Sequence, residues 1–124
     1  MICLDTSSII AYLQGAEGTD VTLIDHALLD QIAVFPPVTL TELLSAPNLS
    51  TTLRQPFLPI PTLPLYEGFG ERAGLLRAKL LNRGSKARLA DTLIAQTCLD
   101  HEIPLVTREQ DFQIFKRIAK LELL

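Results

Sequence analysis

Cysteine, histidine, methionine and tryptophan are scarce in this chain, and their scarcity argues against several kinds of protein. Among 124 residues there are two cysteines, two histidines, one methionine and no tryptophan. Cys3 and Cys98 lie far apart and cannot form the dense disulfide framework of a small secreted protein. We expect both to be buried free thiols in a cytoplasmic protein. His26 and His101 have no evident catalytic partner, and we expect them on the surface or in loops.

Long apolar segments are missing as well. The longest run without a charged residue, 55–66, has 12 residues, whereas a membrane-spanning helix needs roughly 18. The N-terminus has no basic segment, and Asp5 interrupts its only apolar run, so we expect no signal peptide. The sequence predicts a protein that does not enter a membrane.

An overall positive charge is also lacking. The net charge is −3, which argues against non-specific binding of nucleic acid by the whole surface. One segment departs from this balance, because six of the eleven basic residues lie between positions 72 and 88 with no acidic residue among them. They are Arg72, Arg77, Lys79, Arg83, Lys86 and Arg88. This strip is either a solvated helix face with its cationic C-terminal turn or a surface that contacts phosphates.

Apolar residues make up 48% of the chain and follow an alternation of short strands and helices. The expected strands are Met1–Leu4, Gln31–Phe35 and Ile103–Val106, and the expected helices are Ser7–Gln14, Val21–Asp30, Thr39–Ser45, Tyr66–Asn82, Leu89–Asp100 and Phe112–Ile118. Short strands separated by helices favour parallel pairing with right-handed crossovers. The sequence therefore predicts an α/β fold, a compact three-layer sandwich with a small parallel sheet flanked by helices, as a single domain over residues 1–124.

Acidic residues gather where the expected strands end. Asp5 closes the first strand, Glu42 lies in the first turn of the helix after the second, and Asp91 lies near the start of a later helix. Glu109 and Asp111 follow the third strand. The crevice beyond the carboxyl ends of parallel strands is where such folds bind ligands. Converging carboxylates repel one another, and hard oxygen-seeking ions such as Mg²⁺ or Mn²⁺ relieve that repulsion.

Each acid also has a purely structural explanation. Asp5 and Asp111 are suited to cap the helices that follow them. Glu42 has the spacing of a capping box with Thr39, and Asp91 suits a first helical turn. A metal role for Asp5 would leave the capping to the three hydroxyl residues that follow it, Thr6-Ser7-Ser8. The presence of five acids at one end of a sheet favours a charged site over five separate caps.

Four stretches of the sequence, LDTSSII, TLTELL, LADTLIAQTC and PLVTREQDF, together resemble the PIN domain family and, within it, the small VapC-type ribonuclease toxins. The resemblance covers essentially the whole chain. It implies a small parallel α/β fold and metal-dependent cleavage of RNA, with Asp5, Glu42 and Asp91 as acids of the metal site. Glu109 stands where the family usually has Asp or Asn, which leaves the fourth ligand open between Glu109 and Asp111.

The chemistry of phosphodiester hydrolysis agrees with this resemblance. One or two Mg²⁺ or Mn²⁺ ions held by carboxylates can activate water, neutralise phosphate and stabilise the leaving oxygen. We expect Asp5, Glu42, Asp91 and Glu109 to take part in catalysis. Ser7, Ser8 and Thr107 are expected to orient the acids, and the basic strip from Arg72 to Arg88 is expected to contact the RNA backbone.

The resemblance further implies a cognate antitoxin protein as inhibitor and a homodimer. Two other enzyme classes fit less well. A phosphotransferase of the haloacid-dehalogenase type needs a second Asp where Ser7 stands, and a dinucleotide-binding domain needs a glycine-rich loop after the first strand. A PIN-like interaction module without nuclease activity remains the alternative.

Overall fold

The structure is a computed structural model that describes all residues 1–124. It contains three strands and seven α-helices, with two short 3₁₀ helices, η1 and η2. In chain order the elements are β1 (Ile2–Leu4), α1 (Thr6–Leu13), α2 (Thr19–Leu29), β2 (Ala33–Val34), α3 (Pro37–Ser45), α4 (Thr51–Arg54), η1 (Gln55–Phe57), α5 (Phe69–Asn82), α6 (Leu89–His101), β3 (Leu105–Val106), η2 (Gln110–Phe112) and α7 (Gln113–Ala119). None of the helices is both long enough and apolar enough to span a membrane.

The sheet is parallel throughout, with strand order β2-β1-β3. Cys3 in the central strand pairs with Val34 on one side and Leu105 on the other. Single parallel bridges, Phe35 to Thr62 and Leu105 to Leu123, extend the sheet at both edges. The predicted α/β fold with a small parallel sheet is therefore confirmed.

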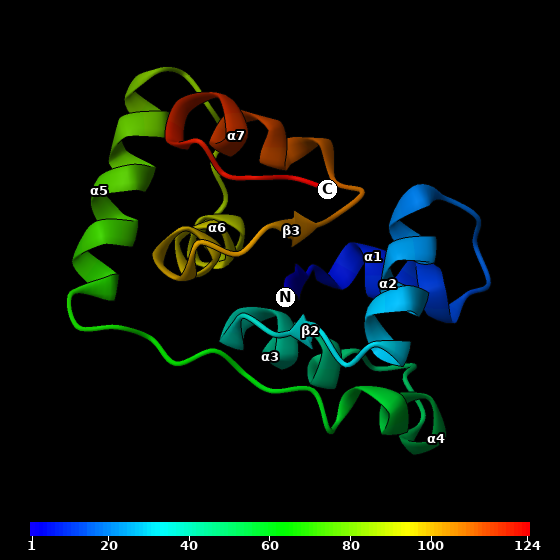
Figure 1. Cartoon of the computed structure of the whole chain (residues 1–124). Helices are drawn as coiled ribbons and strands as arrows, with labels where there is room; N and C mark the ends of the chain where they lie inside the picture. Colours follow the sequence, from blue (N-terminus) through cyan, green and yellow to red (C-terminus); the bar gives the residue numbers. More distant parts are fainter.

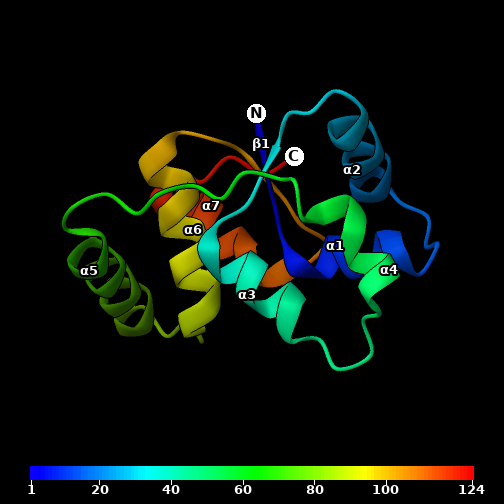
Figure 2. The same ribbon diagram turned by 90° about the horizontal axis from the view of Figure 1, so that it is seen from below.

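Helices cover both faces of this sheet, because successive strand residues point to opposite sides. Ile2 and Leu4 pack into a core with residues of α1, α2, α3 and η1. Cys3 packs on the other face with residues of α5, α6 and α7. Figure 2 shows β1 between these two helical layers, and Figure 1 gives the same division from the side. Cys98 belongs to the same core as Cys3, and both are buried free thiols, as predicted.

Five of the six predicted helices begin one to three residues away from the predicted start, and for α3 and α5 the physical reason is clear. Helix α3 starts at Pro37, two residues before Thr39, because proline fits the first helical position, where its missing N–H costs nothing. The predicted capping box is therefore wrong, and the Thr39 hydroxyl is buried without a hydrogen-bond partner. Helix α5 starts at Phe69 rather than Tyr66, because Gly68 in front of it adopts a left-handed conformation with φ of 80°.

Candidate active site

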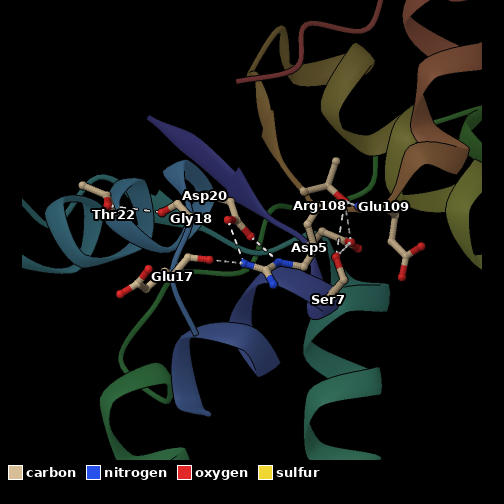
Figure 3. A network of polar contacts seen from close by, with 9 residues as sticks. Asp5, Ser7, Glu17, Gly18, Asp20, Thr22, Arg108 and Glu109 are labelled. Atoms are coloured by element: carbon tan, nitrogen blue, oxygen red, sulfur yellow. Dashed lines mark hydrogen bonds and ion pairs between the residues drawn. The ribbon is translucent and has the colours of Figure 1, made fainter. Parts of the chain in front are cut away.

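Asp5 is a buried carboxylate held from two elements. Its main-chain N–H donates to the Val106 carbonyl at 3.0 Å, which continues the pairing of β1 with β3 by one residue. Asp5 is only 4% exposed, and its Oδ2 accepts a hydrogen bond from Ser7 Oγ at 2.6 Å (Figure 3) and another from Thr107 Oγ1 at 2.8 Å. Asp5 occupies the N-cap position of α1, yet its side chain makes no capping hydrogen bond. Capping therefore does not explain this carboxylate.

The hydroxyls after Asp5 do not cap α1 either, so that expectation was wrong. Thr6 donates to Glu42 Oε1 at 3.0 Å, and Ser7 binds Asp5. Ser8 Oγ is buried without a hydrogen bond, although it faces the Asp20 carboxyl closely enough to help lower its pKa. Of the three residues expected to orient acids, Ser7 and Thr107 contact Asp5 and Ser8 does not.

Glu42 lies one turn further along α3 than the prediction placed it. Since α3 begins at Pro37, Glu42 falls in the second turn rather than the first. Its side chain is exposed, and its bond to Thr6 ties α3 to the start of α1 directly beside Asp5. Glu42 therefore reaches the acidic end of the sheet from a neighbouring helix.

Asp91 lies in the first turn of α6 and is half-buried. Burial and then the Asp5 carboxylate raise its pKa to about 6. Asp111 and Glu42 raise this pKa further, while Arg88 lowers it. A carboxylate is affected in this way when it lies near other acids and lacks a cation that fully balances them. The electrostatics thus group Asp5, Glu42, Asp91 and Asp111.

The two candidates for the fourth acid have different surroundings. Glu109 is exposed, its side chain makes no hydrogen bond, and it is not among the groups that raise the Asp91 pKa. Asp111 does affect Asp91, and it also forms an ion pair of 3.5 Å with Arg88. Asp111 lies in η2 and does not cap α7, whose N-cap position is occupied by Phe112. The capping role considered for Asp111 is therefore wrong.

As the side chains stand, no three His, Cys, Asp or Glu residues are close enough together to hold a metal ion. The donor set is nonetheless of the kind that a hard divalent cation takes, since Asp5, Glu42 and Asp91 offer only carboxylate oxygens. Both side-chain bonds to Asp5 end on Oδ2, so Oδ1 is available as a ligand. The mutual repulsion that raises the Asp91 pKa is also what a cation would relieve.

The basic strip predicted from the sequence is divided in the structure. Arg72 forms a two-bond ion pair with Asp100, of 3.1 and 2.6 Å, at the far end of α6, about 13 Å along the helix from Asp91 at about 1.5 Å per residue. Arg77 Nε donates to the Ala87 carbonyl at 3.0 Å. Lys79 and Arg83 are exposed on α5 and just after it. Only Lys86 and Arg88 line the same pocket as Asp91.

One polar pair beside the site has no counterpart in the sequence prediction. Arg108, which follows Thr107, binds Asp20 through Nε at 2.8 Å and Nη2 at 3.0 Å, and its Nη2 also donates to the Glu17 carbonyl at 3.3 Å (Figure 3). The hydrogen bond from Arg108 is the main reason that the pKa of Asp20 falls to about 2. The pair anchors the loop that presents Thr107 to Asp5.

Gly18 is required by the same arrangement. A Cβ atom at this position would lie 2.6 Å from Asp20 Oδ1 and 3.0 Å from Arg108 Nη2, and the backbone φ is 150°. A glycine just before a helix is the only local sign of a close approach here. Arg108, the partner of Asp20, is 88 positions away in the sequence, so the local sequence could not identify it.

Comparison with known proteins identifies the family of this chain. The family model for the PIN domain matches residues 2–121. Ribonuclease VapC11 of Mycobacterium tuberculosis and VapC ribonuclease Mb1587 of Mycobacterium bovis are each 28% identical to this chain over 130 residues, which cover 98% of this chain and 96% of each relative.

Solved structures agree with the fold over the full length. VapBC-5 from Mycobacterium tuberculosis has 27% identity and a TM-score of 0.68, covering 99% of this chain and 96% of that chain. VapBC2 from Rickettsia felis, crystallised with a DNA fragment from its promoter, has 22% identity and a TM-score of 0.72, covering 100% and 98%. FitAcB from Neisseria gonorrhoeae has 20% identity and the same TM-score, covering 100% and 96%. Because the family model matches nearly the whole chain, this protein belongs to the PIN domain family.

Proposed function

We propose that this protein is a metal-dependent endoribonuclease of the VapC type, formed by one domain over residues 1–124 and using one or two Mg²⁺ or Mn²⁺ ions. The observation that carries the proposal is the buried Asp5 carboxylate at the end of the sheet, which has hydroxyl partners but no cation and lies near Asp91 and two further acids. A fold made only for stability gains nothing from acids that repel one another. The 28% identity to VapC ribonucleases supports the same conclusion.

Asp5 and Asp91 would hold the ion, with Glu42 and either Glu109 or Asp111 completing the set. When bound, Mg²⁺ or Mn²⁺ supplies a water of lowered pKa and neutralises phosphate charge. Ser7 and Thr107 keep Asp5 Oδ2 occupied, so the carboxylate is oriented before any ligand arrives. Glu42 and Glu109 are exposed carboxylates, and either of them, when not bound to the ion, would accept a proton from the attacking water. In the reaction a water oxygen bonds to phosphorus, the bond from phosphorus to the leaving ribose oxygen breaks, and that oxygen takes up a proton from solvent to leave as a hydroxyl group.

Partners follow from the same proposal. The relatives solved as VapBC and FitAcB complexes support an antitoxin partner for this chain. We also propose a cytoplasmic homodimer, with the apolar segment 49–66 as a surface for pairing. This segment exposes four large apolar side chains, namely Leu53, Leu58, Leu65 and Tyr66.

One observation favours the alternative of a non-catalytic interaction module. No three of the acids are gathered around a point, and two of them are engaged elsewhere, Glu42 with Thr6 and Asp111 with Arg88. In that case the acids would serve to bind a basic protein segment rather than a metal ion.

RNA cleavage by the purified chain tests the proposal. Cleavage is measured with EDTA, Mg²⁺ or Mn²⁺ for the wild type, Asp5→Asn and the matched control Asp30→Asn, which changes an exposed aspartate at the end of α2. Circular dichroism establishes that each variant is folded. We expect metal-dependent cleavage by the wild type and by Asp30→Asn, and none by Asp5→Asn. A folded wild type that cuts no RNA, and binds neither ion by calorimetry, would favour the interaction module.

A further inference from the structure

A pocket of about 280 Å³ opens beside Asp91, between the loop before α6 and the segment that contains η2 and α7. Three of its lining residues are cations, namely Lys86, Arg88 and Arg117. Asp91 and Asp111 supply two carboxylates, and a serine and two glutamines supply uncharged hydrogen-bonding groups. Arg117, in the last turn of α7, lies outside the basic strip of the sequence and was not predicted to belong to the site.

The cations of this pocket are not equally engaged. Arg88 is 3.5 Å from Asp111 in an exposed ion pair. Lys86 and Arg117 are exposed and take part in no ion pair. Two cations therefore remain without an acidic partner, and they come from opposite walls of the pocket.

The wall that contains Lys86 is fixed in place. Arg77 on α5 donates from Nε to the Ala87 carbonyl at 3.0 Å, and the Ala87 side chain is buried in the core. Lys86 and Arg88 flank this anchored residue. On the opposite wall, Phe115 of α7 is buried in the same core, two residues before Arg117. A pocket whose two charged walls are both attached to the core is prepared for a ligand before the ligand binds.

The size and position of the pocket indicate which kind of ligand it binds. The volume lies just below the range of about 300–1,000 Å³ that is typical of ligand sites, so the pocket accommodates one nucleotide unit rather than a helix or a folded peptide. Arginine binds phosphate through several donors at once, and lysine contributes a point charge. Since Asp91 lines this pocket and also belongs to the acidic site, a single RNA strand would pass from one to the other without a break.

We propose that Lys86 and Arg117 form a phosphate subsite that binds one nucleotide of the RNA, next to the phosphodiester that is cleaved at the acidic site. The subsite rests on the proposed function, because it assigns a place to the strand that the acids cut. Arg88 is not assigned to the subsite, because in this structure it pairs with Asp111.

The test uses fluorescence anisotropy with a labelled single-stranded RNA of about ten nucleotides, over a range of salt concentrations. All proteins are full-length and contain Asp5→Asn, so that the RNA is not cut. Arg117→Gln and Lys86→Gln are compared with Lys116→Gln, which removes the same charge from an exposed position of α7 outside the pocket. An oligoglutamate peptide serves as an acidic competitor.

We expect Arg117→Gln and Lys86→Gln each to weaken RNA binding about tenfold, and to reduce the slope of log affinity against log salt by about 1. Lys116→Gln should change affinity less than about twofold. The subsite is overturned if Arg117→Gln and Lys116→Gln bind RNA equally. It is also overturned if Arg117→Gln weakens the binding of oligoglutamate and not the binding of RNA. The pocket would then bind an acidic protein segment.

Cleavage assays of proteins with Asp5 intact distinguish a failure of this inference from a failure of the proposed function. For Arg117→Gln we expect KM to rise about tenfold with kcat unchanged, because the contact is the same in the ground state and the transition state. If the wild type binds RNA in an Arg117-dependent way and never cuts it, the subsite stands and the nuclease proposal fails. If cleavage occurs with the same KM in both proteins, the nuclease stands and the subsite fails.

Discussion

The two ends of α6 each have an aspartate, and the two carboxylates have opposite surroundings. Asp100, near the C-terminal end, accepts two bonds from Arg72 and one of 2.8 Å from Gln96. Arg72, the largest influence, lowers its pKa. Asp91, in the first turn, has a pKa raised to about 6 by burial and by neighbouring acids. The same helix thus has a neutralised acid at one end and an unbalanced acid at the other.

A second pair of acids repeats this difference across the acidic site. Asp20 is matched to Arg108 with two bonds, whereas the nearby Asp5 has hydroxyl partners and no cation (Figure 3). Acids paired with arginine therefore flank the site, whereas Asp5 and Asp91 within it form no ion pair. The difference shows that the fold places an arginine beside an acid that contributes to stability, as it does for Asp20 and Asp100. Asp5 and Asp91 have no such arginine, and we propose that the protein binds a divalent metal ion there instead.

The largest expected effect comes from removing the aspartate charge at one end of α6, in comparison with its removal at the other end. Asp91→Asn should lower RNA cleavage about 10³-fold, because it removes an oxygen ligand at the centre of transition-state stabilisation. Asp100→Asn should leave cleavage within about twofold of the wild type. Initial rates with Mg²⁺ and Mn²⁺ measure both variants. Equal losses in the two variants would mean that the ends of α6 do not differ in function.

The second prediction concerns the Asp20–Arg108 pair. Asp20→Asn should lower the free energy of unfolding at pH 7 by about 2 kcal/mol, between the values typical of exposed and buried ion pairs, because the Asp20 side chain is 11% exposed and that of Arg108 is 38% exposed. Since the folded-state pKa of Asp20 is lowered to about 2, this stability is present above the unfolded pKa, near 4, and is lost as pH falls toward 2. Urea unfolding of the wild type and the variant between pH 2 and pH 7 measures it.

Two further variants control that experiment. Arg108→Gln in combination with Asp20→Asn should cost less than the sum of the single changes, because both remove the same interaction. Gly18→Ala should also destabilise the protein, because its Cβ would meet Asp20 and Arg108. Full additivity of Asp20→Asn and Arg108→Gln would mean that the pair contributes no coupling.

The third prediction distinguishes the two candidates for the fourth acid. Asp111 is among the main causes of the raised pKa of Asp91 and Glu109 is not, so Asp111→Asn should reduce cleavage about tenfold, as removal of one supporting acid does in metal sites. Glu109→Gln should reduce it less than about threefold. Cleavage rates at saturating Mg²⁺ compare the two. A larger loss in Glu109→Gln would assign the fourth position to Glu109 instead.

The smallest expected effect is a pH dependence of stability in the metal-free protein. Because the folded-state pKa of Asp91 is raised, its contribution to stability is fully present below the unfolded pKa and is lost as pH rises through about 6. Asp91→Asn should therefore be more stable than the wild type at pH 8 by about 1 kcal/mol, after allowing for partial solvent screening. Thermal unfolding in EDTA at pH 4 and pH 8 measures it. An advantage that is the same at both pH values would contradict the assigned pKa.

The fold was largely predictable because its signals are local. Apolar runs set off by polar turns located all three strands, and helical spacing located most of the helices. The start of α3 was missed because two local signals competed, and Pro37 at the first helical position prevailed over the capping pattern of Thr39 and Glu42. The buried, unpaired state of both cysteines was also predictable, because the chain has only two and they lie far apart in the sequence.

The surroundings of the site were less predictable because they depend on contacts between distant segments. The sequence placed Asp5, Glu42 and Asp91 at one end of the sheet, but the Arg108–Asp20 pair joins residues 88 positions apart. The basic strip looked continuous in sequence, yet Arg72 turned toward Asp100 at the opposite end of α6. Arg117 lay outside the strip and reaches the pocket of Asp91 only through the packing of α7.

The most direct test of the account is the titration of the Asp91 carboxyl by NMR, with and without Mg²⁺. In the metal-free wild type we predict a pKa of about 6, a lower pKa in Asp5→Asn because a repelling carboxylate is gone, and a pKa below the ordinary aspartate range of about 4 when Mg²⁺ is saturating. An Asp91 that titrates near its ordinary range in all three samples would contradict the central claim that unbalanced acids at this end of the sheet form a cation site.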